Sequence, residues 1–334
     1  MTTVQATHTP AVSIVSRIAN DQRLPYVILF LLTALFVYLT PFNDHSKVFT
    51  PAGQLILHGS NPYLLKTGYF LYWPFSFWFF PLMALHPIEY YLLYVLNIIL
   101  LIVITRRLEI SAWWCLYPAA LFTIIYGQID IIILFMMVEA YRRRQSPLAI
   151  ILVALAASVK PQTTIFWVLP WLWTLPTWRV RIGYSLAVGA ILLVPMGIAF
   201  AIAPQMMIAL WQDWLRLTHE TSGVYVGNSL SLWSLGLIIP GILFLILSVV
   251  FSRQHKVARP MMALGMPAMG YYTSVVLVGA LPTWGILVAY VSISLTLVLN
   301  HNFFWIEPIV ILAYYAWLWW RNRSSATLVQ STAS

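Results

Sequence analysis

The residue best suited to acid–base chemistry is Asp44, a carboxylate two residues after a long uncharged run from Leu24 to Phe42. The chain has only nine Asp and Glu residues in 334, so each of them can be weighed individually. A carboxylate at the end of an apolar segment can accept a proton from a hydroxyl group in water. It can equally mark the end of a helix and take no part in chemistry.

The composition decides which solvent surrounds this residue. Hydrophobic residues make up 61% of the chain and charged residues 8%, whereas soluble domains have roughly 45–50% and about 25%. We therefore expect an integral membrane protein. The net charge of +9 comes from short basic clusters between apolar runs, which is the positive-inside pattern and predicts no nucleic-acid partner. The single cysteine, Cys115, excludes an intramolecular disulfide.

The apolar runs predict the elements that must position Asp44. A helix needs about 20 apolar residues to cross a bilayer. The runs that meet or approach this length are 24–42, 89–105, 111–126, 128–141, 147–159, 161–176, 183–203, 230–251, 261–280, 284–299 and 303–320. The sequence thus predicts an all-α, polytopic membrane protein of about ten to eleven transmembrane helices.

Charge predicts the orientation. If the short, aromatic segment 73–86 only dips into the membrane, the basic clusters all share one side with the N-terminus, as the positive-inside rule favours. These clusters are Arg106/Arg107, Arg142–Arg144, Arg179/Arg181 and Arg253/Lys256/Arg259. Three full crossings after Arg259 would leave Arg321 and Arg323 outside, so we expect one of the last three runs not to cross fully.

This topology divides the chain into three parts. Residues 1–23 form a cytoplasmic tail without a cleaved signal, residues 24–320 a single transmembrane domain in the plasma membrane, and residues 321–334 a second tail. Polar stretches 43–72 and 204–229 become outer loops. Within the first, Val48–Leu57 has apolar residues near helical spacing, which predicts a juxtamembrane helix lying flat on the membrane.

Four short motifs, in order, resemble those of the GT-C superfamily of membrane glycosyltransferases, and most closely the polyprenyl-phosphomannose-dependent mannosyltransferases of glycosyltransferase family 87. The first motif is the loop after Asp44, in which Phe49 stands for a family Tyr and Trp73 for a family Pro. The others are Tyr126-Gly127-Gln128-Ile129-Asp130, Ala156-Ala157-Ser158-Val159-Lys160-Pro161-Gln162 and Gly227-Asn228-Ser229-Leu230.

The resemblance implies a GT-C-like fold and an inverting transfer of a hexose, with mannose expected. The donor would be a polyprenyl phosphate-linked sugar in the membrane lipid, the acceptor a glycan or glycolipid on the outer face, and Asp44 the general base. No metal or other cofactor is expected. The residues expected to bind substrate are Lys47, Asn61, Tyr63, Gln128, Asp130, Lys160, Asn228 and His301.

Several of these residues have a second interpretation. Lys160, before Pro161 in an apolar run, binds phosphate at a helix break or snorkels from a helix end. Asp130 binds substrate or is a helix-start carboxylate hydrogen-bonded to its neighbours. Glu307 is expected to be a buried, paired carboxylate, and Arg216 to lie on a solvated face.

Two other functions compete with the transferase. Asp130, Lys160 and Glu307 within apolar runs would also suit a transporter or a flippase of lipid-linked sugars. An inert scaffold would tolerate replacement of Asp44. The concentration of polar residues in the two outer loops favours the enzyme, and the sequence contains no Walker A or Gly-x-Ser-x-Gly motif.

Overall fold

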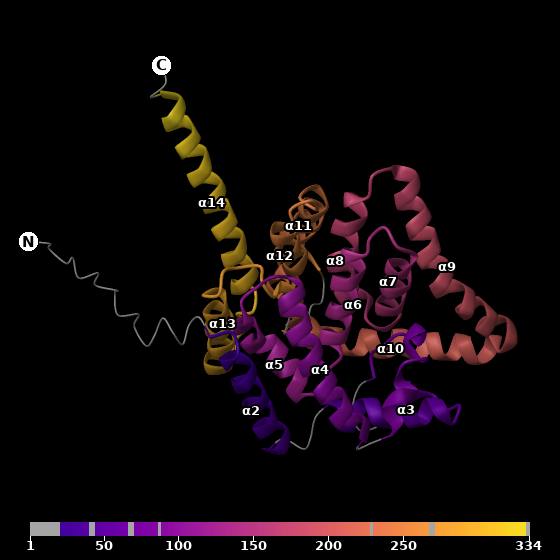
Figure 1. Cartoon of the computed structure of the whole chain (residues 1–334). Coiled ribbons are helices and arrows are strands. Elements are labelled where there is room, and N and C mark those ends of the chain that lie inside the picture. The colour runs from indigo at the N-terminus through magenta and orange to yellow at the C-terminus, as the bar shows by residue number, and fades with distance from the viewer. Residues whose placement is uncertain are drawn as a thin grey trace, which may run out of the picture.

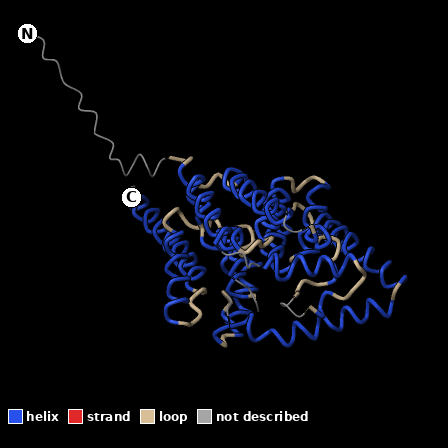
Figure 2. Tube along the Cα trace, turned by 90° about the horizontal axis from the view of Figure 1, so that it is seen from below, coloured by secondary structure: helices blue, strands red, loops and turns tan. Residues whose placement is uncertain are grey.

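The computed structural model describes residues 21–39, 44–65, 70–85, 88–227, 230–266 and 271–331. Within these ranges the protein is all-α, as predicted, and Figure 2 shows helices along nearly the whole trace. The helices are α2 (Leu24–Leu39), α3 (Thr50–Leu57), α4 (Ile88–Arg107), α5 (Pro118–Ile125), α6 (Asp130–Arg142), α7 (Pro147–Val159), α8 (Pro161–Thr174), α9 (Trp178–Ile202), α10 (Pro204–Gly227), α11 (Ile238–Val250), α12 (His255–Gly265), α13 (Gly285–Leu299) and α14 (Ile306–Ser331).

Helix α6 lies at the centre of the bundle. Nine of its 13 residues are buried, and it packs against α4, α7 and α8. The Ile131–Met137 stretch of α6 is apolar on every side of the helix. A helix of this kind stabilises the fold only when neighbouring helices cover all its faces. Asp130 is the first residue of α6 and Glu139 lies near its last, so this central helix carries one carboxylate near each end.

Helix α9 has the opposite environment. It is 25 residues long and apolar, and none of its residues is buried. By length and composition it and the Tyr90–Arg107 part of α4 are the two described helices that could cross a membrane. Four more apolar helices, α2, α7, α11 and α13, have 10–17 residues. The expected ten to eleven crossings stay a prediction.

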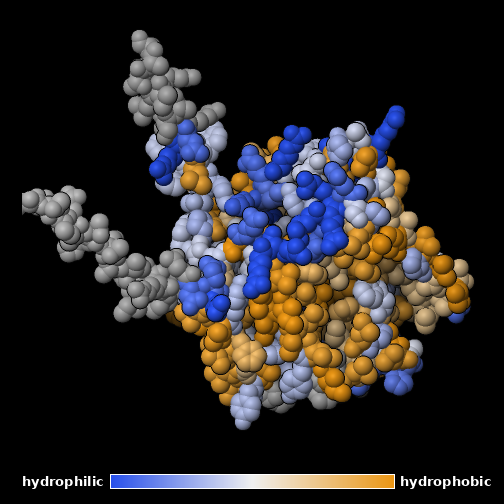
Figure 3. All heavy atoms as spheres, in the orientation of Figure 1, coloured by the Kyte–Doolittle hydropathy of each residue, from blue (hydrophilic) through white to orange (hydrophobic). Residues whose placement is uncertain are grey.

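Basic residues gather at one end of the bundle. Arg107, Arg142 and Arg143 meet at Glu139, and the Arg106 guanidinium lies 5.9 Å from the Tyr26 ring near the start of α2. Figure 3 shows this end as a hydrophilic band above a broad hydrophobic surface. At the opposite end α3 and α10 run crosswise to the bundle (Figure 1).

Three predictions about loops can be compared with the fold. Residues 45–57 form a π-helical turn, η1 (His45–Phe49), and then α3, which confirms helical structure over Val48–Leu57, while its position on a membrane surface stays a prediction. Segment 73–86 makes, within its described part, only the 3-10 turns η3 (Pro74–Ser76) and η4 (Phe80–Ala84), in agreement with a segment that does not span.

The polar stretch 204–229, expected as an outer loop, is helical in its described part, and its position outside a membrane stays a prediction. Residues Pro204–Gly227 form one helix, α10. Its buried residues Met207, Leu210, Leu217 and Thr221 recur at helical spacing; the polar residues between them occupy the exposed face and gave the segment the composition of a loop.

The run 261–280 is not one helix either. Helix α12 ends at Gly265, and Tyr271–Leu277 form a separate 3-10 element, η7. The Arg259 guanidinium, on α12, donates a 2.7 Å hydrogen bond to the carbonyl of Val276. The chain therefore lies again at the level of Arg259 by the end of η7, as expected of a run that does not cross fully.

Candidate active site

Asp44 lies at the start of η1, at the end of the bundle crossed by α3 and α10, and its side chain is partly buried. The side chain of Gln128 donates from Nε2 to Asp44 Oδ2 over 2.5 Å. Two further hydrogen bonds fix Gln128. Tyr72 donates to its Oε1 at 3.3 Å, and Asn97 donates to its backbone carbonyl at 3.1 Å. Because Oε1 accepts from Tyr72, the amide NH₂ group of Gln128 must face the carboxylate.

Gly127 explains how Gln128 reaches Asp44. Its φ of +66° lies in the left-handed region, and a Cβ at this position would stand 2.7 Å from the Cβ of His45. A residue with a side chain would thus meet both backbone strain and a clash. Gly127 and Gln128, which belong to one of the four sequence motifs, lie in the turn between α5 and α6, directly against His45.

Burial raises the pKa of the Asp44 carboxyl above its ordinary value of 3.8. The hydrogen bond from Gln128 and the charges of Lys160 and Lys47 lower the pKa in part, but burial has the larger effect. A carboxylate with a raised pKa is a better proton acceptor near neutral pH. The side chain of Lys47 is exposed, so a cation stands near this carboxylate on its outward side.

Lys160 lies at the predicted helix break. Helix α7 ends at Val159 and α8 begins at Pro161, while Lys160 itself has the non-helical angles φ −141° and ψ 79°. Its Nζ lies 2.6 Å from Oδ2 of Asp130, and the two side chains are 9% and 0% exposed. The alternative of a snorkelling helix end was wrong, because the charge is buried and paired.

Asp130 is the first residue of α6, as its helix-start interpretation expected. Besides Lys160, it accepts a hydrogen bond from Thr163 on the first turn of α8 at 3.4 Å. This arrangement places the Lys160 ammonium where its charge still reaches Asp44. Whether Asp130 and Lys160 bind substrate stays a prediction.

Asn61 and Tyr63 hold the first loop in place. Asn61 donates to Asp213 Oδ2 of α10 at 2.7 Å and accepts from the backbone N–H of Tyr63 at 2.9 Å. The buried Tyr63 hydroxyl donates to the carbonyl of Tyr72 at 2.8 Å. Polar contacts thus run from α10 through this loop to Gln128. The substrate-binding roles of Asn61 and Tyr63 stay predictions.

Trp73 stands where the resemblance to the GT-C transferases led us to expect a proline, and its side chain has a clear structural role. Its indole Nε1 donates to the carbonyl of Ser158 at 2.5 Å, and the indole of Trp78 donates to the Ser158 hydroxyl at 2.8 Å. Ser158 lies two residues before Lys160. The aromatic segment is therefore attached to the helix end that presents this lysine.

The remaining predicted residues lie away from Asp44 or outside the described ranges. His301 is exposed, between α13 and α14, and no contact between it and the Asp44–Gln128 pair is found among the described residues. Asn228 lies outside the described residues. Glu307 is buried and accepts a 2.6 Å hydrogen bond from Tyr117, which confirms a buried, paired carboxylate.

Sequence reasoning missed two residues, Asn97 and Asp213, that hold this site. Asn97 is a lone amide in the apolar run 89–105, and that position was a usable signal because a buried amide needs a partner.

Arg216 is half-exposed and pairs with Asp213 and Glu220 at 3.2 and 3.3 Å, which agrees with a solvated face.

The described residues contain no group of three or more His, Cys, Asp or Glu side chains that could hold a metal ion. In comparisons with known proteins, no family model, no curated protein and no solved structure matches the chain.

Proposed function

We propose that this protein is a GT-C-type membrane glycosyltransferase in which Asp44 is the general base. It would transfer a hexose, with mannose as the first candidate, from a polyprenyl phosphate-linked donor to a glycan or glycolipid acceptor. The observation that carries the proposal is the Asp44–Gln128 pair, a partly buried carboxylate fixed by a neutral amide at the end of the bundle.

The location in a membrane is part of the proposal. Helix α9 exposes apolar side chains along its whole length, and a surface of that kind is costly in water but not in lipid. The basic end in Figure 3 would face the cytoplasm by the positive-inside rule. Asp44 would then stand at the outer face, where an aqueous acceptor meets a donor whose chain stays in lipid.

The chemistry needs one base and a stabilised leaving group. As the acceptor hydroxyl oxygen bonds to the anomeric carbon, its proton passes to Asp44, the bond from that carbon to the phosphate oxygen breaks, and the configuration inverts. Gln128 occupies Oδ2, which leaves Oδ1 to accept the proton. The departing polyprenyl phosphate needs little acid help, and the exposed Lys47 can stabilise its charge.

The test is transfer by the full chain, reconstituted in vesicles with polyprenyl-phosphomannose and candidate acceptors. Asp44→Asn should reduce the initial rate by about 100-fold or more, because general-base catalysis contributes about 10²–10⁴. The matched control is Asp21→Asn, an exposed carboxylate at the other end of α2, which should leave the rate unchanged.

Undiminished transfer by Asp44→Asn would remove Asp44 as the base. Movement of the lipid-linked sugar between leaflets without transfer would support the transport alternative instead. Equal melting temperatures of the two variants and the wild type establish that the comparison concerns chemistry and not folding.

A further inference from the structure

A hollow of about 400 Å³ opens at the basic end of the molecule, far along the bundle from Asp44. It is lined by Arg107 from the end of α4 and by Tyr141 and Arg142–Arg144 from the end of α6. The hydrophilic band in Figure 3 lies over this end. The hollow is therefore a concave surface on which guanidinium groups from two helices converge.

The charges around this hollow do not balance. Arg107, Arg142 and Arg143 each lie 3.2 Å from the buried carboxylate of Glu139. Arg144 instead lies over the Tyr141 ring, 5.3 Å from its centroid. Four guanidinium groups thus line the hollow, three of them share the single carboxylate of Glu139 behind it, and positive charge is in excess. The guanidinium side chains bound to Glu139 are still 41–53% exposed, so they can contact a ligand as well.

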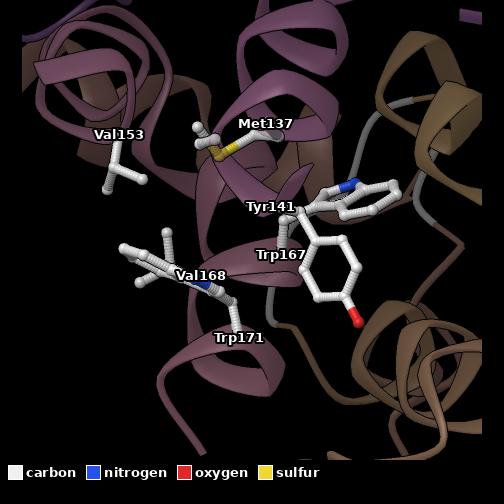
Figure 4. Close-up of a pocket in the computed structure, with 7 residues that line it drawn as sticks. Met137, Tyr141, Val153, Trp167, Val168 and Trp171 are labelled. Carbon is white, nitrogen blue, oxygen red and sulfur yellow. The ribbon is translucent and has the colours of Figure 1, made fainter. Parts of the chain in front are cut away.

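Below the arginines the molecular surface is broadly hydrophobic (Figure 3), and the buried interior behind Tyr141 is aromatic. Tyr141 also lines a second, small pocket between α6, α7 and α8 with Met137, Val153, Trp167 and Trp171 (Figure 4). The indole N–H groups of Trp167 and Trp171 are buried without a hydrogen-bond partner among the described residues. Aromatic rings beneath basic side chains are typical of the boundary between hydrocarbon and water.

We propose that the arginine-lined hollow binds the headgroup of an anionic phospholipid. Guanidinium groups bind phosphate oxygens through paired N–H donors, and basic pockets between transmembrane helices bind acidic lipid headgroups. The excess positive charge would repel the amine of a zwitterionic headgroup. The broad hydrophobic surface below the basic band (Figure 3) favours a lipid over a soluble phosphate. This site is separate from Asp44, and the proposal does not rest on the transfer reaction.

The test measures lipid binding to the purified, delipidated full chain by native mass spectrometry. Phosphatidylglycerol and phosphatidylcholine with identical acyl chains are added, and glycerol 3-phosphate tests the soluble source. The variant is Arg143→Gln/Arg144→Gln, which keeps Arg107 and Arg142 on Glu139. Each basic residue near a membrane contributes a few-fold to anionic lipid binding, so affinity for phosphatidylglycerol should fall by about tenfold or more.

The matched control is Arg179→Gln/Arg253→Gln, which removes two exposed basic charges that do not line the hollow. It should bind phosphatidylglycerol within about twofold of the wild type. The single variant Arg144→Gln, which does not touch Glu139, should give an intermediate loss and guards against misfolding of the double variant. Equal loss in the control, no preference for phosphatidylglycerol, or equally tight binding of glycerol 3-phosphate would overturn the proposal.

Discussion

The two ends of the bundle each hold a carboxylate that is largely withdrawn from water, but they hold it differently. Glu139 is bound by three guanidinium groups, whereas Asp44 is bound by one neutral amide. The three guanidinium groups contact both carboxylate oxygens of Glu139 and link the ends of α4 and α6. A neutral donor fixes the orientation of Asp44 while burial raises its pKa. The partners thus distinguish a structural acid from a candidate base.

The largest expected contrast comes from neutralising these two carboxylates in turn. Asp44→Asn should abolish nearly all transfer, by about 100-fold or more, with little change in melting temperature. Glu139→Gln should lower the free energy of unfolding by about 1–3 kcal/mol, since hydrogen bonds to a charged group are lost. Its transfer rate per folded molecule should stay within a few-fold. Rates and thermal melts of both variants measure the contrast, and the reverse pattern would contradict it.

The next effect concerns the ion pair beside Asp44. Asp130→Asn leaves the buried Lys160 ammonium without its partner, which should cost about 3–5 kcal/mol of stability. The double variant Asp130→Asn/Lys160→Met removes the uncompensated charge and should recover most of that loss. Denaturant melts in a mild detergent measure both variants. A single variant as stable as the wild type would show that the pair is not buried in the folded protein.

Gly127 offers a smaller and more local perturbation. Gly127→Ala should destabilise the protein by about 1–3 kcal/mol, because φ of +66° is strained for alanine. The added Cβ would also press on His45 and move Gln128 away from Asp44. Gly59→Ala is the control: it has a φ of +68°, but no heavy atom lies within 4 Å of the added Cβ. Equal transfer rates in both variants would argue against the His45 contact.

The smallest effect is on pH dependence. Transfer should increase as Asp44 loses its proton, with a midpoint above the ordinary value of 3.8 because burial raises the pKa. Gln128→Leu removes a hydrogen bond that lowers this pKa, so the midpoint should move to higher pH. Because burial raises the pKa of Asp44 in the folded protein, the stability that its protonated form contributes should be lost as pH rises from 3.8 through the raised pKa. Asp44→Asn should remove this dependence of stability on pH. Rate–pH profiles check the first effect, and melts across pH the second.

The sequence predicted those parts of the site that depend on neighbours in the chain. Asp130 begins a helix, as its helix-start interpretation expected, and Lys160-Pro161 predicted the helix break that separates α7 from α8. The long-range pairs could not be read in the same way. Asp130 and Lys160 are 30 residues apart, and their meeting depends on how α6 packs against the junction of α7 and α8.

The helix within 204–229 escaped sequence reasoning for a different reason. Composition alone indicated a loop, because the polar side chains of α10 outnumber the four buried positions that fix its packing. The hydrogen bond between Asn61 and Asp213 could not be predicted for the same reason, because Asp213 lies 152 residues away on a helix that was not expected. Helical spacing of the apolar residues was the signal that could have identified this helix.

In the proposed membrane location, the junction of α9 and α10 would give bilayer thickness a route to Asp44. A 25-residue helix is about 37 Å long, which exceeds a hydrocarbon core of about 30 Å, so a membrane-spanning α9 would tilt to match its bilayer. Only Ala203 separates α9 from α10, and α10 holds Asn61 through Asp213. A thinner bilayer would increase the tilt of α9 and, through this short corner, pull on the loop that orients Gln128. We expect catalysis to depend on lipid chain length even when the donor and acceptor are unchanged.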